Sequence, residues 1–518
     1  MGVSGLSARG FVSLTAALTA LGCVDAEAAP HVIVSVEALR PDSPGTSELP
    51  PVFDPGDRVE RLDSKDGTFR IHYARKGEHA VPAADADADG VPDYVQLVAA
   101  EYDAVGEFYA NELGFARPAV DDAVRGDNGG DGRFDVYLLD FPTSADGAFV
   151  VEECAAPSAR RCPGYMKHEN DFAGRNYPTL ARATRILASH EYFHAVQAGY
   201  DAKAGGVISE GTAVWASEAY DPTLTDLENF VSGYLDRPDR GLAQEVTGPV
   251  DSFSYGASLF FQFLSERYDR DVIRELWSAQ RDSGAGTAWV RALDDVLRAE
   301  HESSLADAFA DFTRWNLYTA GRADPGVAYA RGEGYPELKA KAVTLPLEDT
   351  GTRIFPLAAK VYSARAAKSG ALQLALRSEG SLEGVRLLLA REVGGRIREV
   401  KEARADDAAA VTLEQVDAGD EIIAAVINTR LSGESARPDV CLGGASDTKD
   451  CAQARGVSAS DAGRDDADAE GEAHERSSGC TVSARLGMRR DAWWLIAVGA
   501  ALGVAVRRRR ERARVLAS

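Results

Sequence analysis

The residues with the clearest chemical spacing in this chain are two histidines and a glutamate near its middle. His190 and His194 are four positions apart, and Glu191 directly follows the first of them. On an α-helix, positions i and i+4 lie on the same face, so both imidazoles can reach one metal ion. Glu191 lies beside that face and can take a proton from a water molecule at the metal. The spacing therefore predicts a metal-dependent hydrolytic centre.

The surrounding sequence predicts the helix that must position these residues. Residues 180–197 contain no proline and include the apolar side chains of Ile186, Leu187 and Phe193. Gly199 marks the expected end of the helix. A catalytic zinc ion takes three protein ligands and keeps one position open, so a third ligand must come from another element.

The segment after the histidines resembles the one that supplies the third metal ligand in gluzincins. In that group, a second helix returns a glutamate to the zinc ion after a comparable loop. Here Gly205-Gly206 provides the turn, and Glu210 begins the similar stretch Glu-Gly-Thr-Ala. The resemblance implies that Zn²⁺ is held by His190, His194 and Glu210, with Glu218 orienting a ligating histidine. The alternative for Glu210 is a charge at a helix N-terminus, which the helix dipole favours.

The predicted chemistry is hydrolysis of peptide bonds by a zinc-activated water. Zn²⁺ lowers the pKa of such a water towards about 7 and polarises the scissile carbonyl. Glu191 takes the proton and passes it to the leaving amine. Tyr255 opens an apolar segment at 259–264, and a tyrosine at such a helix start stabilises the oxyanion in related enzymes. Packing in the core is the alternative role for Tyr255.

Five sequence blocks resemble a family of metalloproteases named from myxobacteria, within the gluzincin group of zincins. They are ADGVPDYV at 88–95, GRFDVYLLD at 132–140, HEYFHAVQ at 190–197, EGTAVW at 210–215 and SYGASLFFQFL at 254–264. The resemblance covers residues 69–318, about half of the chain, and implies a zincin-like catalytic domain at 69–340 followed by a β-rich domain. One departure follows Trp215, where related sequences carry an acidic pair and this chain has Ala216-Ser217-Glu218.

A run of aspartates before the next predicted helix has the spacing of a calcium-binding loop. The alternating carboxylates and the glycine at 90 resemble the first half of an EF-hand loop. Gln96 stands where that loop carries a bidentate glutamate. We expect Ca²⁺ here, and the alternative is an acidic turn that caps the helix at 95–113. A second acidic loop at 127–132 is more typical of a plain turn. The expected calcium ligands are Asp85, Asp87, Asp89 and Asp93.

The N-terminus and the cysteines predict export. Residues 1–29 combine an apolar stretch with a small-residue cleavage pattern, which is typical of a signal peptide. Region 30–68 reads as either an N-terminal strand region or a pro-segment. In an oxidising compartment two short disulfide loops are expected. The expected pairs are Cys154 with Cys162 and Cys441 with Cys451.

The C-terminal tail predicts attachment to a membrane. Residues 452–479 are acidic and poor in large apolar side chains, which favours a disordered linker. Residues 480–518 contain Cys480, a short apolar stretch with two tryptophans, and an arginine cluster, as in a transmembrane helix. This arrangement resembles the myxobacterial C-terminal sorting signal. It implies sorting or processing machinery as a partner and a location at the cell surface or outer membrane, with release as a further outcome.

The whole chain is expected to be an α+β protein, with a zincin-like domain followed by an all-β sandwich-like domain at 344–451. Its formal net charge of -24 argues against nucleic acid as a partner. A protein or peptide substrate is expected instead. Two other hypotheses keep the zincin fold without peptidase activity. One is a catalytically inactive surface protein, and the other is a calcium-stabilised adhesin.

Overall fold

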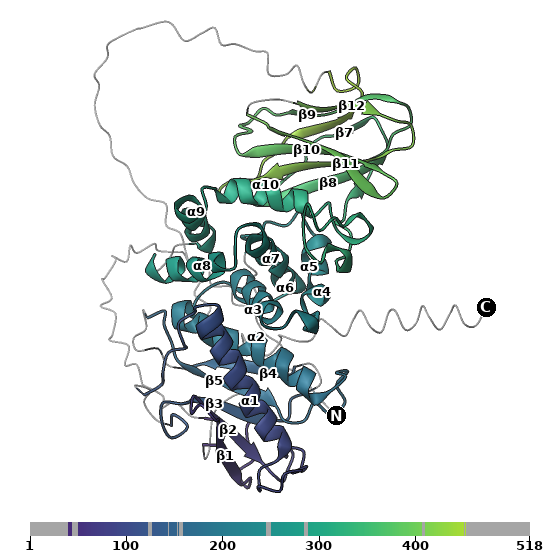
Figure 1. The fold of residues 1–518 in the computed structure, drawn as a ribbon. Coiled ribbons are helices and arrows are strands. Elements are labelled where there is room, and N and C mark those ends of the chain that lie inside the picture. The colour runs from purple at the N-terminus through teal and green to yellow at the C-terminus, as the bar shows by residue number, and fades with distance from the viewer. Residues whose placement is uncertain are drawn as a thin grey trace, which may run out of the picture. The chain divides into compact units, whose positions relative to one another are not determined.

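A computed structural model describes residues 40–43, 50–122, 127–142, 145–152, 154, 159–244, 250–283, 288–406, 410–449 and 451. The expected signal peptide at 1–29, the linker at 452–479 and the tail at 480–518 with Cys480 lie outside the described residues. The described part is a mixed α and β structure with several sheets and helices (Figure 1). None of the helices in these ranges is both long and apolar enough to cross a membrane.

The first sheet has five strands in the order β1-β2-β3-β5-β4. Strands β2, β3 and β5 are parallel, whereas β1 and β4 run antiparallel to their neighbours at the two edges. β1 lies within region 30–68, so this part of the region completes the sheet. The strands are β1 (Val59–Asp63), β2 (Phe69–Ala74), β3 (Phe134–Leu139), β4 (Gly147–Val151) and β5 (Gly164–Glu169).

The two faces of this sheet have different cores. Because successive side chains of a strand point to opposite faces, Val136 and Met166 enter the main core while Tyr137 and Tyr165 enter a smaller one. The main-core face packs against α1 (Asp93–Glu107), which continues as the π-helix η1 (Phe108–Glu112), and against α2 (Leu180–Asp201). In Figure 1, α1 lies across the strands.

Helix α2 and helix α3 (Gly206–Tyr220) form the centre of the chain. The side chain of Thr179 caps α2 by accepting a hydrogen bond from the Arg182 N–H. Every residue of α2 from 187 to 201 is buried, because the helix lies between the sheet on one side and α3 and α8 (Asp271–Asp282) on the other. A helix so covered presents no polar face to water, so its polar side chains must find partners inside the protein.

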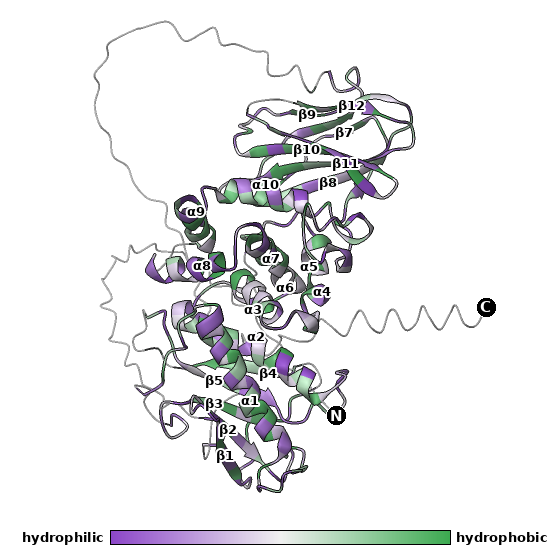
Figure 2. Ribbon diagram, viewed as in Figure 1, coloured by the Kyte–Doolittle hydropathy of each residue, from purple (hydrophilic) through white to green (hydrophobic). Residues whose placement is uncertain are grey.

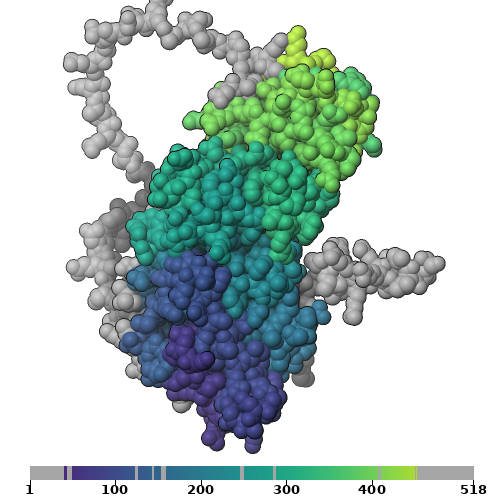
Figure 3. Space-filling view, viewed as in Figure 1, coloured from purple at the N-terminus to yellow at the C-terminus, as the bar shows by residue number. Residues whose placement is uncertain are grey.

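A set of helices follows α3 and surrounds it. Two of these helices lie so close together that a Cβ atom added at Gly256 would be 2.4 Å from the backbone nitrogen of Tyr234. Only glycine fits at this position. On the face shown in Figure 3, the teal atoms of this region form a continuous surface. The elements are η2 (Pro222–Leu224), α4 (Leu227–Phe230), α5 (Ser232–Leu235), α6 (Ser252–Gly256), α7 (Ser258–Arg267), α8 (Asp271–Asp282), α9 (Trp289–Glu300), α10 (Leu305–Trp315), η3 (Ala320–Arg322) and η4 (Gly332–Gly334).

The C-terminal region consists of two further sheets, in the orders β11-β10-β13-β8-β6 and β12-β9-β14-β7. Their inner faces share one core, and their strands carry both green and purple segments in Figure 2. The strands are β6 (Lys341–Ala342), β7 (Leu347–Asp349), β8 (Ala358–Arg365), β9 (Gly370–Arg377), β10 (Val385–Val393), β11 (Arg396–Arg404), β12 (Ala410–Val416), β13 (Glu421–Asn428) and β14 (Asp439–Gly443).

The central strands of the first of these two sheets, β10 and β13, are buried on both faces. Leu387 and Ala424 point into the core between the sheets, whereas Leu388 and Ala425, one position on, belong to the main core together with the helices. The β-rich region therefore shares its core with the helical region. The two expected disulfides are present as Cys154–Cys162 and Cys441–Cys451.

Candidate metal centre

Helix α2 carries the first three residues of the candidate centre into the interior of the protein. His190, Glu191 and His194 retain only 9%, 4% and 6% of their accessible surface. The rings of His190 and His194 lie 5.0 Å apart between centroids, at one face of the helix, as positions i and i+4 require. Burial of three ionisable groups is unfavourable unless they bind a partner, so this cluster needs a structural or chemical explanation.

Helix α3 brings Glu210 to both histidines. Its Oε2 atom lies 3.3 Å from His190 Nε2 and 3.6 Å from His194 Nε2. One donor atom of each residue falls within 4.8 Å of the others. Within the described part of the chain, Glu210 Oε2 is buried and accepts no protein hydrogen bond of normal geometry. Two imidazole nitrogens and a carboxylate oxygen that converge in this way fit the donor set of a catalytic zinc site.

The charges of this cluster are strongly coupled. Burial by itself would lower the pKa of His194, but the Glu210 carboxylate outweighs burial and raises that pKa to about 9. Burial would likewise raise the pKa of Glu210, but the two histidines lower it to about 2. Glu210 is therefore an ionised carboxylate inside the protein, and a cation between the three groups would be electrostatically favoured.

Gln197 supports His194 and was not expected from the sequence as a functional residue. The Nδ1 atom of His194 lies 2.8 Å from Gln197 Oε1. The Gln197 amide in turn donates to the Ser209 carbonyl at 2.8 Å and to Thr212 Oγ1 at 2.9 Å. Because Oε1 can only accept, His194 carries a proton on Nδ1, and Nε2 is the ring nitrogen that faces Glu210. The signal in the sequence was its position one helical turn after His194, on the same face.

Glu218 does not have the contacts expected of it. The structure pairs its carboxylate with Arg331, which also pairs with Glu228. The reason is geometric, because eight residues along α3 place Glu218 about 12 Å further along the helix axis than Glu210. The orienting role expected for Glu218 is taken at His194 by Gln197. Burial raises the pKa of a second acid, Asp226, and nearby His190 opposes that rise.

Glu191 contacts the edge strand of the first sheet. Its Oε2 atom accepts a hydrogen bond of 3.2 Å from the backbone N–H of Phe149 in β4. Phe149 is paired with Met166 of β5, and β4 is the last strand in the sheet order. The Phe149 N–H therefore points away from β5 and towards the base on α2.

Tyr255 lies at the same centre. Its ring is 6.0 Å from the ring of His190 and 5.1 Å from that of Phe230, nearly parallel to both. Its hydroxyl is hydrogen-bonded to Glu210, and burial together with the charges of Glu210 and Glu191 raises its pKa well above the usual value. The phenol is consequently neutral and available as a hydrogen-bond donor.

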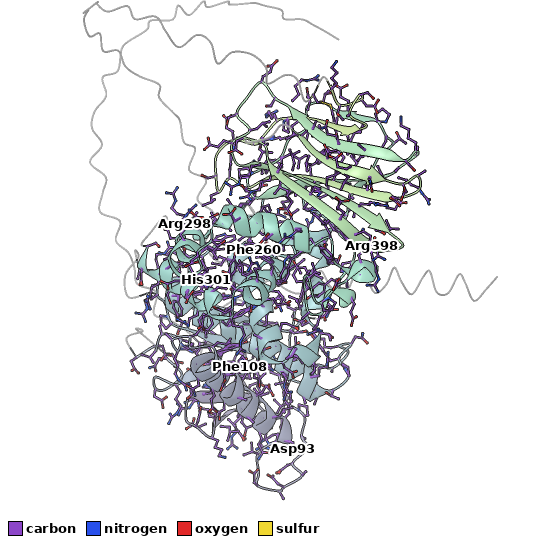
Figure 4. The ribbon with its side chains drawn as sticks, turned by 45° about the horizontal axis from the view of Figure 1, so that its top comes forward. Asp93, Phe108, Phe260, Arg298, His301 and Arg398 are labelled. Carbon is purple, nitrogen blue, oxygen red and sulfur yellow. A yellow bond between two sulfur atoms is a disulfide. The ribbon has the colours of Figure 1, made fainter. Side chains whose placement is uncertain are left out.

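The aspartate loop before α1 is a different kind of site. Asp85, Asp87 and Asp89 bring oxygen atoms within 4.8 Å of one another, but they are at most half-buried. The expected fourth ligand, Asp93, instead accepts a hydrogen bond from the Ala86 N–H at 2.9 Å. Figure 4 labels Asp93 at the start of α1. Calcium binding at this loop stays a prediction.

The other carboxylates of the loop are engaged within the loop itself. Asp89 accepts hydrogen bonds from the Val91 N–H and from the Gln96 side chain, at 2.8 and 2.9 Å. In the second acidic loop, Asp131 pairs with Arg70 and Arg133. Arginine cations neutralise that loop, which agrees with a plain turn.

Comparison with known proteins adds little. No protein-family model matches the sequence, and no curated protein matches it. One similar solved structure is the pre-peptidase C-terminal domain of a collagenase from Bacillus anthracis, with 10% identity, a TM-score of 0.16, and coverage of 20% of this chain and 94% of that one. Another is Legionella pneumophila aminopeptidase A in complex with aspartic acid, with 12% identity and a TM-score of 0.29.

The match to the aminopeptidase covers 74% of this chain but only 36% of the other. This chain therefore spans about a third of the aminopeptidase. Likenesses of this strength identify neither the fold nor the activity, so function has to be inferred from the site.

Proposed function

We propose that this protein is a zinc-dependent metallopeptidase. The observation that supports this most is the convergence of His190, His194 and Glu210 in a buried site, with Glu191 beside them. Buried ionisable groups without a bound cation would be costly, whereas a zinc ion would compensate them. His190, His194 and Glu210 are the residues that would hold it. When bound, zinc supplies an activated water and polarises the substrate carbonyl.

The chain's own residues have complementary roles in the proposed reaction. Glu191 takes a proton from the attacking water and transfers it to the nitrogen of the leaving amine. The Phe149 N–H holds one oxygen of Glu191, so the other oxygen is free to move the proton. Tyr255 donates a hydrogen bond to the carbonyl oxygen as it becomes negative. In the absence of substrate, this phenol contacts Glu210.

A peptide is the substrate class that the position of β4 supports. An open strand edge binds extended chains through main-chain hydrogen bonds. β4 is at the edge of its sheet, and its outward Phe149 N–H points at the catalytic base. A peptide lying along β4 would thereby bring a backbone carbonyl next to Glu191.

Export to the cell surface is part of the proposal. It is supported by the signal-like residues 1–29, by the two disulfides and by the tail that resembles a sorting signal. The tail would also be the contact with the membrane and with the sorting machinery. Calcium at the aspartate loop would be a second bound ion.

The proposal is tested by measuring zinc content and peptide cleavage together on the exported chain. We expect about one zinc ion per chain in the parent and in Glu191→Gln. Cleavage of casein or of a peptide library should fall by about 10³-fold in the variant, because only the proton transfer is removed. Glu112→Gln, at an exposed glutamate, is the matched control and should retain full activity.

Two other results would reject this proposal in different ways. Zinc in both proteins with cleavage in neither would favour the catalytically inactive surface protein. Zinc in neither would contradict the assignment of His190, His194 and Glu210 as ligands.

A further inference from the structure

Arg40 is a fully buried cation in the segment that precedes the first sheet. Its side chain has 0% accessible surface and lies among three carboxylates. The guanidinium nitrogens lie 2.5 Å from Asp121, 3.2 Å from Asp135 and 2.9 Å from Glu152. The guanidinium carbon also lies 4.5 Å above the ring of Tyr165. These four residues surround the guanidinium group of Arg40.

The residues of this site come from neighbouring strands. Asp135 is in β3, Tyr165 is in β5, and Glu152 directly follows β4. β3, β5 and β4 are adjacent in that order in the sheet. Tyr165 belongs to the smaller core, on the face away from the main core that contains α2. Arg40 therefore spans three strands on the face opposite to the candidate metal centre.

The site is built for a planar cation. Burial is the largest influence on both Asp121 and Glu152, and raises their pKa to about 6 and about 7 although Arg40 opposes the change. Asp135 also contacts His72 Nε2 at 2.6 Å. Without Arg40, three buried carboxylates would lie close together with no cation between them, which is unfavourable. A lysine would keep the charge but could not bridge three partners, because only the guanidinium group is a rigid fork of five donors.

The contact between Arg40 and Glu152, called the clamp below, lies close in sequence to the part of β4 that contacts Glu191. Glu152 is three residues after Phe149, whose N–H donates to Glu191. β4 is also held by β5, by packing of Phe149 against the main core that contains α2, by the Glu152 N–H donating to the Pro163 carbonyl at 2.9 Å, and by the Cys154–Cys162 disulfide beyond its end. Removal of Arg40 would leave the Glu152 carboxylate at the end of β4 without its cation and would weaken the attachment of this end of the strand.

We propose that Arg40 is a positioning residue for the edge strand β4, and through the Phe149 N–H for Glu191. Arg40 acts from the far face of the sheet and touches no residue of the metal centre. The geometry of β4 beside Glu191 therefore depends on the segment 40–43, which lies far from both in sequence. The catalytic consequence rests on the proposed peptidase function, whereas the clamp on β4 does not.

The test compares the full chain with Arg40→Met and with Glu152→Gln, which removes only the negative charge at the end of β4. Backbone hydrogen exchange in residues 147–152 should become about tenfold faster in both variants, while exchange in α2 and α3 stays unchanged. The kcat for peptide cleavage should fall by about tenfold. Zinc affinity should stay within twofold, because all three ligands are on α2 and α3. Arg298→Met, at an exposed arginine labelled in Figure 4, is the control and should change none of these values.

Different outcomes separate the clamp from the peptidase proposal. Unchanged exchange at 147–152, or an equal increase over the whole chain, would overturn the role of Arg40. If Arg40→Met does not fold, Glu152→Gln still decides the matter through the same segment. A parent protein without peptidase activity would reject the proposed function, but faster exchange confined to β4 would still support the clamp.

Discussion

The His190–His194–Glu210 centre and the Asp85–Asp89 loop both group ligand-type side chains within 4.8 Å, yet they differ in almost every other respect. The first is buried between two long helices, and the second is an exposed turn before α1. In the first, Glu210 Oε2 accepts no normal hydrogen bond within the described chain and faces two imidazoles. In the second, backbone N–H groups and Gln96 bond most of the carboxylate oxygens of Asp85 and Asp89, and only Asp85 Oδ1 is buried there without a hydrogen-bond partner in the described chain.

This difference shows how burial separates two sites that look alike as spacing patterns. An exposed carboxylate is solvated, so its presence in a loop has little energetic cost and needs no ligand. A buried one must be compensated, so its neighbours are selected and fixed. The network of Gln197, Thr212 and Trp277 behind His194 is such a support, with Trp277 Nε1 donating to Thr212 Oγ1 at 3.2 Å. No comparable network lies behind the loop among the described residues.

The largest effect is expected from removing that support. Gln197→Leu keeps the size of the side chain but leaves His194 Nδ1 and the Ser209 carbonyl without partners. The loss of such an orienting contact should weaken zinc binding by about 10- to 100-fold. Competition with a chromophoric chelator measures this affinity without reference to activity.

Two control variants distinguish the loss of the hydrogen bonds behind His194 from a general disturbance of packing. Gln262→Leu, on α7, removes a hydrogen bond to Glu266 and should leave zinc affinity unchanged. Gln197→Glu keeps an acceptor for His194 but loses the amide donor, so an intermediate affinity is expected. Equal affinity in the parent and in Gln197→Leu would mean that the centre needs no support, and the contrast with the loop would lose its basis.

A second prediction concerns His168, which lies in the first sheet and belongs to neither of the two sites. His168 in β5 is fully buried, and burial lowers its pKa to about 3. In the unfolded chain its pKa is about 6.5, so between these values only the unfolded state takes up the proton. The stability from neutral His168 is therefore present above pH 6.5 and is lost as the pH falls towards 3.

This prediction is measured by urea unfolding at pH 7 and pH 5. His168→Asn should reduce the loss of stability between the two pH values by about 2 kcal/mol, since each pKa unit corresponds to about 1.4 kcal/mol. The hydroxyl of Tyr102, which lies 3.3 Å from His168 Nδ1, can still bond the new amide. The same decline with pH in parent and variant would show that His168 is not neutral in the folded protein. It would then resemble His194, whose pKa the Glu210 carboxylate raises.

Much of the metal centre could be predicted from sequence because its ligands repeat at helical spacing. His190, Glu191 and His194 needed only the period of one helix. Glu210 was suggested by the resemblance to gluzincins, in which a second helix returns a glutamate to the metal. Tyr255 could be suggested only by resemblance, and the structure does bring it to Glu210. Its catalytic role stays a prediction.

Contacts between distant segments could not be predicted in this way. Gln197 lay inside a recognised motif, yet its partners Ser209 and Thr212 become visible only when α2 and α3 are packed together. Arg40 had no local signal, because its three carboxylates come from residues 121–152. The succession of helices followed by strands did indicate a mixed fold, but the shared core of β10, β13 and the helices depends on which strand face meets which helix.

The smallest effect is expected at the aspartate loop. Weak calcium sites of extracellular proteins have dissociation constants near 10⁻³ M, so 5 mM Ca²⁺ should raise the melting temperature of the parent by only about 2 °C. Asp87→Asn combined with Asp89→Asn should abolish this rise, since both residues are exposed and their loss strains no packing. Zinc content and peptide cleavage should be unchanged, because the loop shares no residue with the metal centre.

This last prediction is tested by melting curves recorded without added ion, with Ca²⁺, and with Mg²⁺ as the control ion. A rise that survives in the double variant would place calcium elsewhere in the chain. No rise in the parent would reduce the loop to an acidic turn that caps α1, where Asp93 already lies in the first helical turn. The two sites would then differ fully. Both were predicted from the spacing of their side chains, but only the site with the buried carboxylate would bind an ion.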